Sequence, residues 1–436
     1  MTFRPLPGFR DFAPADLALR AHLFGAWRRV ATRYGFEEYD GPPLEPLELY
    51  TAKSGDEIVG QLYNFTDKGG REVALRPEMT PTLARMVSEH ANGLKKPIRW
   101  FSMPQLFRYE RQQRGRLREH FQLNCDLIGE AGALADAEII ALAIDVLREL
   151  GLTATDFKVR LSDRRLLDGI LDALDIAPPH RPLLMQALDK LGRAEYAGRK
   201  QAFLEAAGAD RVEALEIVEA LRDRRSWSEL EQSLAAYPTA IAAGQPLREA
   251  VAALEAMGLG EFIELDLSIV RGIAYYTGTV FELFDVQRSL RAICGGGRYD
   301  TLLANLGGVD LPALGFGMGD VVLGELLKER GLLPATESSI DVFVTAVTPE
   351  DVPHVLAMAH RLRGAGMRTE YAFHATALGK QFKTADARGA RLVVVIGPDD
   401  RARGEVQLKQ LMAKTQESVS HEAVTDRCRE LLSGIA

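Results

Sequence analysis

A helical stretch separates the strand-forming parts of this chain. Residues 165–258 are rich in Leu, Ala, Asp, Glu and Arg, with apolar residues at helical spacing and few strand signals. Short strand-like runs lie before it, between residues 62 and 128, and strand character returns after it, from 262 to 294. Polar or Gly-containing turns separate most of these runs, which is typical of an antiparallel sheet. We therefore predict an α+β domain formed by residues 1–164 and 259–330, with residues 165–258 as a helical insertion.

Two long helices are expected before the insertion. Residues 16–34 place Leu23, Phe24, Trp27 and Val30 at helical spacing. Residues 135–150 form a second apolar-rich segment, which ends before Gly151, a residue that often stops a helix.

The C-terminal part has a different pattern. Residues 331–339, GLLPATESS, read as a linker. Strand-like segments at 341–347, 368–373, 391–397 and 405–411 then alternate with helical segments at 350–364, 377–388 and 422–433. Alternation of this kind predicts a separate α/β domain over residues 340–436 with a mostly parallel sheet.

Composition excludes few functions. The chain has 436 residues, 47% of them hydrophobic, and no apolar run approaches the ~18 residues of a membrane span. No secretory signal is visible, and three widely spaced cysteines suit a reducing cytosol, so we expect a cytoplasmic protein without a membrane partner. The net charge of −8 does not predict a polyanionic partner, although local basic segments still allow one.

The segment RGIAYYTGTVFE, residues 271–282, combines a fixed cation with two adjacent tyrosines. In a strand, Tyr275 and Tyr276 point to opposite faces, and Arg271 offers planar donors suited to a carboxylate or phosphate. Taken alone, a core strand with an exposed arginine is an equally good interpretation.

Two further segments carry polar groups suited to a ligand. FRYERQQRGRLREHFQ, residues 107–122, is predicted to form a hairpin with an arginine-rich loop, which can grip phosphates or remain a solvated surface hairpin. In LRPEMTP, residues 75–81, Glu78 and Thr80 lie two residues apart, so an extended segment points both to one side, where they can receive an ammonium group. A simple proline-bounded turn is the plainer alternative.

Glycine-rich segments add weaker signals. CGGGRYD (294–300) and GFGMGD (315–320) allow close backbone approach or simply flexible turns. Neither lies in a strand–loop–helix unit with the acidic residue of a dinucleotide site, and no phosphate-loop signature is present.

These segments occur in an order that resembles the histidyl-tRNA synthetase family of class II aminoacyl-tRNA synthetases. The resemblance covers nearly the whole chain and is most specific at RGIAYYTGTVFE. It also includes LPGFRD (6–11), YGF (34–36) followed by Pro42 as motif 1, GKQFKTAD (379–386) and VVIG (394–397).

The resemblance implies a class II catalytic domain and a C-terminal anticodon-binding-like domain. It also implies a two-step reaction: L-histidine and ATP, with Mg2+, form histidyl-adenylate and pyrophosphate, and the histidyl group then passes to the 3′ end of tRNA(His). Because motif 1 usually forms the interface between two subunits, a homodimer is expected.

The resemblance further implies roles for individual residues. Arg108 and Arg271 would be the catalytic cations. The histidine site would comprise Glu78, Met79, Thr80, Arg108, Gln122, Asp126, Arg271, Tyr275 and Tyr276. ATP would be bound by Arg108, Glu110, Arg116, His120 and Phe121, with either of the last two rings stacking on adenine, while Gln113 and Arg114 would contact the tRNA acceptor end.

This chain departs from the family pattern at four places. Val322 stands where most members have the motif 3 arginine that contacts the γ-phosphate, and valine cannot make that contact. We hypothesise that Arg116, or Arg298, supplies the missing cation. The other departures are Asp126 for glutamate, Ala274 for aspartate, and His-Phe at 120–121 in place of Phe-His.

A second hypothesis belongs to another class of protein. Non-catalytic paralogues resembling the regulatory subunit of ATP phosphoribosyltransferase bind histidine as sensors. They generally lack the anticodon-binding domain and lose motif 2 residues, whereas this chain retains the domain together with Arg108, Glu110, Gln122 and Arg271.

The Arg116 hypothesis makes a kinetic prediction. Arg116→Ala should raise the KM for ATP in histidine-dependent ATP–pyrophosphate exchange, because a charged donor to the terminal phosphates would be lost. An unchanged KM for ATP would remove Arg116 from this role.

Overall fold

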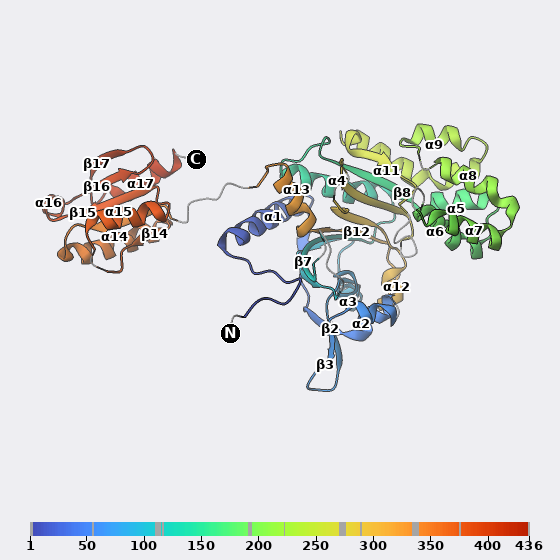
Figure 1. The fold of residues 1–436 in the computed structure, drawn as a ribbon, viewed down its shortest axis with the longest axis horizontal. Helices are drawn as coiled ribbons and strands as arrows, with labels where there is room; N and C mark the ends of the chain where they lie inside the picture. Colours follow the sequence, from blue (N-terminus) through green and yellow to red (C-terminus); the bar gives the residue numbers. More distant parts are fainter. Residues whose placement is uncertain are drawn as a thin grey trace. The chain divides into compact units, whose positions relative to one another are not determined.

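The computed structural model describes the chain except for residues 1–2, 55, 110–114, 116, 191–193, 222, 270–275, 288–289, 334–339, 375 and 435–436. The chain divides into two compact units, Met1–Pro334 and Ala335–Ala436, which are described separately (Figure 1). Among the described residues, no helix is long and apolar enough to cross a membrane.

A mixed sheet forms the centre of the N-terminal unit. Its strand order is β1-β5-β7-β12-β11-β10-β8-β9, with β6 paired to β7. The inner pairs from β5 to β8 are antiparallel, as predicted, and the parallel pairs β1–β5 and β8–β9 lie at the two edges. The strands are β1 (Glu37–Glu38), β5 (Ile98–Ser102), β6 (Gln105–Phe107), β7 (Glu119–Ile128), β8 (Phe157–Asp163), β9 (Ile263–Leu265), β10 (Thr279–Asp285), β11 (Cys294–Arg298) and β12 (Ala313–Gly319).

Helices α1 (Pro14–Arg33), α4 (Ala133–Glu149) and α13 (Asp320–Glu329) lie along one side of this sheet (Figure 1). The first two match the predicted helices within two residues. Trp27 of α1 is fully buried, and most of α4 is buried because small and branched apolar residues surround its axis. Gly151, at φ +88°, follows the end of α4 as expected.

A smaller layer lies on the other side of the sheet (Figure 1). A three-stranded sheet has the order β2-β4-β3 and packs with short helices. The elements are β2 (Leu44–Pro46), β3 (Asn64–Thr66), β4 (Glu72–Leu75), α2 (Leu47–Ser54), α3 (Thr80–His90) and α12 (Leu302–Gly307).

The described residues between β8 and β9 form helices joined by short turns, with no strand among them. Its buried side chains, such as Phe203, Leu215 and Leu247, belong to the same apolar cluster as the sheet and α4. The insertion therefore shares the core of the N-terminal unit. Its helices are α5 (Arg164–Ala173), α6 (Arg181–Asp189), α7 (Tyr196–Ala207), α8 (Val212–Leu221), α9 (Trp227–Ser233), α10 (Pro238–Ala243) and α11 (Gln245–Ala256).

The C-terminal unit is an α/β fold with strand order β14-β13-β15-β16-β17. Only β13 pairs in parallel, with β14 and β15, while β15–β16 and β16–β17 are antiparallel. Half of the strand pairs are antiparallel, so the prediction of a mostly parallel sheet is wrong. It did not include β17, whose polar sequence TQESVS lacks a clear apolar face. The elements are β13 (Val342–Ala346), β14 (Thr369–Tyr371), β15 (Leu392–Ile396), β16 (Glu405–Gln410), β17 (Thr415–Ser420), α14 (Val352–Gly364), α15 (Leu378–Ala387), α16 (Pro398–Ala402) and α17 (Val424–Ser433).

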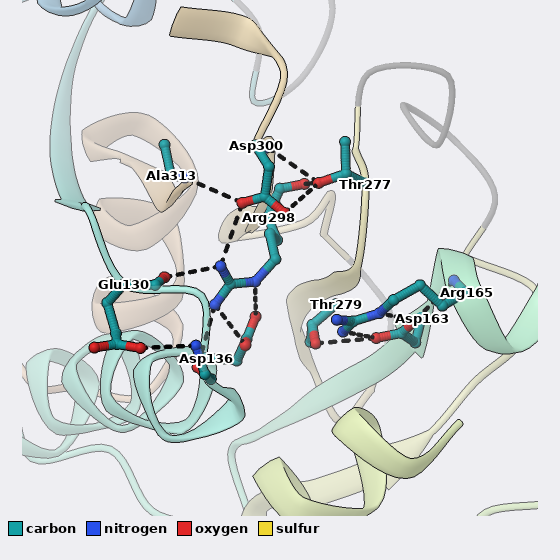
Figure 2. A network of polar contacts seen from close by, with 10 residues as sticks. Glu130, Asp136, Asp163, Arg165, Thr277, Thr279, Arg298, Asp300 and Ala313 are labelled. Carbon is teal, nitrogen blue, oxygen red and sulfur yellow. Dashed lines mark hydrogen bonds and ion pairs between the residues drawn. The ribbon is translucent and has the colours of Figure 1, made fainter. Parts of the chain in front are cut away.

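A buried arginine joins β11 to the start of α4 (Figure 2). Arg298 is 1% exposed and donates to both carboxylate oxygens of Asp136, at 3.2 and 2.8 Å. Its remaining N–H groups donate to Asp300 and to the backbone oxygens of Glu130 and Gly132. All five donors are therefore used within the fold.

Removing this arginine should destabilise the N-terminal unit. Arg298→Met leaves Asp136 buried without its partner, which costs about 3–5 kcal/mol. Urea unfolding followed by tryptophan fluorescence reports on this unit alone, since Trp27, Trp100 and Trp227 all lie within it.

Arg148→Met is the matched control, because its ion pair with Asp145 is half exposed and should contribute at most about 1 kcal/mol. Equal losses in the two variants would contradict a structural role for the Arg298 network.

Candidate active site

A cavity of about 1060 Å³ opens on the face of the main sheet that lies away from α4. Strand β7 passes through its wall and has two chemically different faces. Leu123, Cys125 and Leu127 join the core with α1 and α4. Alternate residues face the cavity instead. They are His120, Gln122, Asn124 and Asp126.

Glycines on the neighbouring strand make room for two of these side chains. Gly315 lies opposite Asp126, and a Cβ at Gly315 would come within 2.3 Å of the Asp126 carboxylate. A Cβ at Gly317 would come within 2.6 Å of the Gln122 amide. The glycine-rich segment 315–320 therefore forms a flat wall over which both polar groups extend.

Two tyrosines lie at the Asp126 end of the cavity. The Tyr299 hydroxyl donates a hydrogen bond to Asp126. Tyr276 lies over Gly297, where a Cβ would come within 2.9 Å of its ring. Burial, followed by nearby negative groups, raises the pKa of Tyr276. The phenol therefore stays protonated at neutral pH and is suited to hydrogen bonding with a neutral ring nitrogen.

Glu78, Thr80 and Arg108 line the cavity as well. Thr80 begins α3, and Arg108 follows β6 and donates from Nε to the Pro77 carbonyl at 3.1 Å. The structure thus brings a carboxylate, a hydroxyl and a guanidinium from two of the predicted motifs into one cavity.

Buried Arg76 holds these two motifs together. Its Nε donates to the Gln105 carbonyl at 3.1 Å, which ties the LRPEMT turn to β6. Its Nη1 donates to Asp40 and to the Gly41 carbonyl. Arg76 is 4% exposed and does not line the cavity. Its contacts therefore position the segments that carry Glu78 and Arg108.

Two predicted site residues, Met79 and Phe121, do not line the cavity. Met79 is buried in the core, with its sulfur 3.8 Å from Arg76 Nη1, and does not line the cavity. Phe121 lies on the opposite face of β7 from His120, packed against Phe24 and beneath Arg20. Strand alternation explains the second correction: of the two adjacent rings, His120 reaches the cavity.

Two buried carboxylates paired with the partly exposed Arg10 support this end of β7. Arg10 Nε lies 2.6 Å from Glu119, and its Nη1 lies 2.9 Å from Asp320. Asp320 also accepts a hydrogen bond from the Phe121 backbone at 2.9 Å. The network ties the N-terminal segment, β7 and the start of α13 together directly beside His120.

The hypothesis that Arg298 compensates for Val322 is wrong. Val322 lines the cavity, whereas Arg298 does not and uses all its donors in the network of Figure 2. The remaining predicted residues lie outside the described part of the chain. These are Glu110, Gln113, Arg114, Arg116, Arg271 and Tyr275.

The sequence interpretation missed several cavity residues, among them Tyr299, Arg160 and Asp266. Tyr299 reaches Asp126 because β11 and β12 align Gly297 with Gly315, a register that no local pattern reveals. Arg160 of β8 lies 3.5 Å from Asp266 and over the Phe284 ring. Arg160 and Asp266 both line the cavity. Their ion pair depends on the pairing of β8 with β9, which the sequence alone does not show.

Comparison with known proteins identifies the family. The family profile described as Histidyl-tRNA synthetase matches residues 8–319, and that described as Anticodon binding domain matches residues 341–431. A histidine–tRNA ligase of Opitutus terrae is 46% identical over 434 residues, covering 99% of both chains. The chain belongs to the histidyl-tRNA synthetase family.

Solved structures agree on the fold. The crystal structure of histidyl-tRNA synthetase from Nostoc sp. PCC 7120 has a TM-score of 0.82 at 27% identity, covering 99% of both chains. An ATP phosphoribosyltransferase regulatory subunit/histidyl-tRNA synthetase from Bacillus halodurans has a TM-score of 0.71 at 23% identity, covering 91% of this chain and 98% of that one. This second likeness concerns the fold alone.

The close approach of Gln122 to Gly317 leads to a prediction about histidine binding. Gly317→Ala should displace the Gln122 amide and weaken histidine binding on the order of tenfold, as the loss of one buried hydrogen bond implies. Isothermal titration with L-histidine measures this effect.

Gly319→Ala is the matched control, since Gly319 also lines the cavity but has no atom within 4 Å of the position that an added Cβ would take. Equal histidine affinities in the two variants would show that Gln122 does not contact this ligand.

Proposed function

We propose that this chain joins L-histidine to tRNA(His) in two steps. In the first, a histidine carboxylate oxygen bonds to the α-phosphorus of ATP while the bond to pyrophosphate breaks. In the second, the 3′-terminal ribose hydroxyl of the tRNA bonds to the carbonyl carbon and AMP leaves. The match to a histidine–tRNA ligase over nearly the whole chain carries this proposal, and the polar cavity supports it.

The Asp126 end of the cavity is proposed to take histidine. Glu78 and Thr80 offer acceptors to the α-ammonium, and Gln122 and Asp126 face the amino-acid pocket. Tyr276 offers a protonated hydroxyl to an imidazole nitrogen. A site with buried polar groups of this kind rejects amino acids that leave those groups unpaired, by ~10⁴ or more.

The His120 end is proposed to take ATP. His120 can stack on adenine, while Arg108 lines the same cavity and is proposed to contact both the α-phosphate and the histidine carboxylate. Arg271 is proposed to stabilise charge that develops on the α-phosphate, since fixed cations supply much of the catalysis in phosphoryl chemistry. Glu110 and Arg116 are proposed to add contacts to ATP.

Mg2+ is proposed to enter with ATP. A magnesium ion bound to a nucleotide takes most of its ligands from phosphate oxygens and water, and needs only one or two carboxylates from the protein. Glu282 of β10 lines the cavity and fits that requirement.

The tRNA is proposed to contact both units. Gln113 and Arg114 would meet the acceptor end, and the C-terminal unit would read anticodon bases by their edges and by stacking. We also propose a cytoplasmic homodimer, with residues 1–164 and 259–330 as the catalytic domain, 165–258 as the insertion, 331–339 as the linker and 340–436 as the anticodon-binding domain.

A histidine sensor remains the alternative from another functional class. The match of residues 341–431 to an anticodon-binding domain favours the synthetase, because sensors of this kind generally lack that domain. The cavity is also lined by His120 and Val322, beyond the residues proposed to bind histidine. This additional part is proposed to take ATP, which a histidine sensor does not require.

Histidine-dependent ATP–pyrophosphate exchange, followed by charging of tRNA(His), tests the proposal. The unaltered protein should support both reactions, and Arg271→Gln should lower kcat for exchange by about 10²–10³-fold because a cation at the transition state is lost. Histidine binding without exchange in the unaltered protein would favour the sensor.

A further inference from the structure

Three segments meet at the wall of the cavity around Val322. Val322 lies in the first turn of α13, Gly115 belongs to the hairpin between β6 and β7, and Arg291 precedes β11. A Cβ on Gly115 would lie 3.2 Å from Val322 Cγ2 and 3.8 Å from Arg291 Cδ. All three residues line the cavity, so the stem of Arg291 lies beside the position where valine replaces a cation.

The sheet register explains this placement. Strand β11 runs antiparallel to β12, with Cys294 opposite Met318 and Gly295 opposite Gly317. The residues just before β11 therefore run alongside the end of β12 and the start of α13. Arg291 is exposed on this segment, whereas Ile293, two residues later, is buried.

Arg291 differs from the other arginines in the described cavity wall. Arg160 is paired with Asp266 and stacked over Phe284, and Arg108 donates to the Pro77 carbonyl. Within the described residues, Arg291 has neither an ion pair nor a hydrogen-bond partner for its guanidinium. Its planar donors are therefore available to an anionic ligand.

The cavity has room for an extended ligand between its two ends. His120 and Asp126 are six residues apart on β7, which corresponds to about 20 Å along a strand. With histidine at the Asp126 end, ATP is left the part of the cavity lined by His120, Gly115 and Val322. The side chains of Leu117, Val321 and Val322 in that part of the wall carry no charge.

We propose that Arg291 binds the β- and γ-phosphates of ATP and stabilises the pyrophosphate as it leaves. This inference rests on the proposed function, since it takes ATP as the ligand of the cavity. Arg291 contributes from the segment before β11 the cation that Val322 cannot contribute from α13. Charge-assisted hydrogen bonds to phosphate oxygens are among the strongest polar contacts in proteins, so the contact should be measurable.

The test compares two ligands that differ in their terminal phosphates. Arg291→Ala should weaken ATP binding in isothermal titration, and raise the KM for ATP and for pyrophosphate in exchange, by about 10–100-fold. It should bind a histidyl-sulfamoyl-adenosine, which resembles the adenylate but lacks the terminal phosphates, as tightly as the unaltered protein. Arg291→Lys should give intermediate values, because it keeps the charge without the fork of donors.

Arg248→Ala is the control, since Arg248 is exposed on α11 away from the cavity wall. Equal ATP affinity in Arg291→Ala and Arg248→Ala would overturn the inference, as would an equal loss of affinity for the sulfamoyl compound and ATP. A loss confined to Arg116→Ala would assign the role to Arg116 instead.

The same measurements separate this inference from the proposed function. Failure of the unaltered protein to catalyse exchange would count against the synthetase, while the ratio of ATP affinities between Arg291→Ala and its parent would still decide the role of Arg291. An unaltered protein that binds no ATP would overturn both.

Discussion

The two faces of β7 set the arrangement of the N-terminal unit. One face supplies apolar side chains to the core with α1 and α4, and the other supplies a row of polar groups to the cavity. Because side chains alternate along a strand, a shift of register by one residue would bury the polar row and expose the apolar one. The hydrophobic core therefore fixes which side chains can reach a ligand.

Glycines and buried charges make this arrangement possible. Gly315 and Gly317 let Asp126 and Gln122 lie across the neighbouring strand, where any Cβ would collide with them. Breaking a buried ion pair is costly because the remaining charge is left without a partner, so such pairs fix the elements that carry them. Arg10 fixes β7 relative to α13 through Glu119 and Asp320, and Arg298 fixes β11 relative to α4 through Asp136.

Much of the fold follows from local sequence patterns. Helices α1 and α4 matched their apolar periodicity, and the strand–helix alternation of the C-terminal unit was visible, although polar β17 was not. Motif order indicated the cavity residues Glu78, Arg108 and Asp126. The inward position of Met79 depends on packing around Arg76, and the partner of Tyr299 depends on strand register, so neither could be deduced from neighbouring residues.

The roles of two arginines could not be predicted from the sequence alone. Arg298 and Arg291 lie seven residues apart in one glycine-rich region, and both carry a permanent positive charge. Asp136 and three further acceptors occupy the guanidinium of Arg298 in the interior, while the guanidinium of Arg291 is exposed at the cavity wall. A carboxylate brought from α4 thus converts the first into a structural group. The second, without such a carboxylate among the described residues, keeps its donors for a polyphosphate.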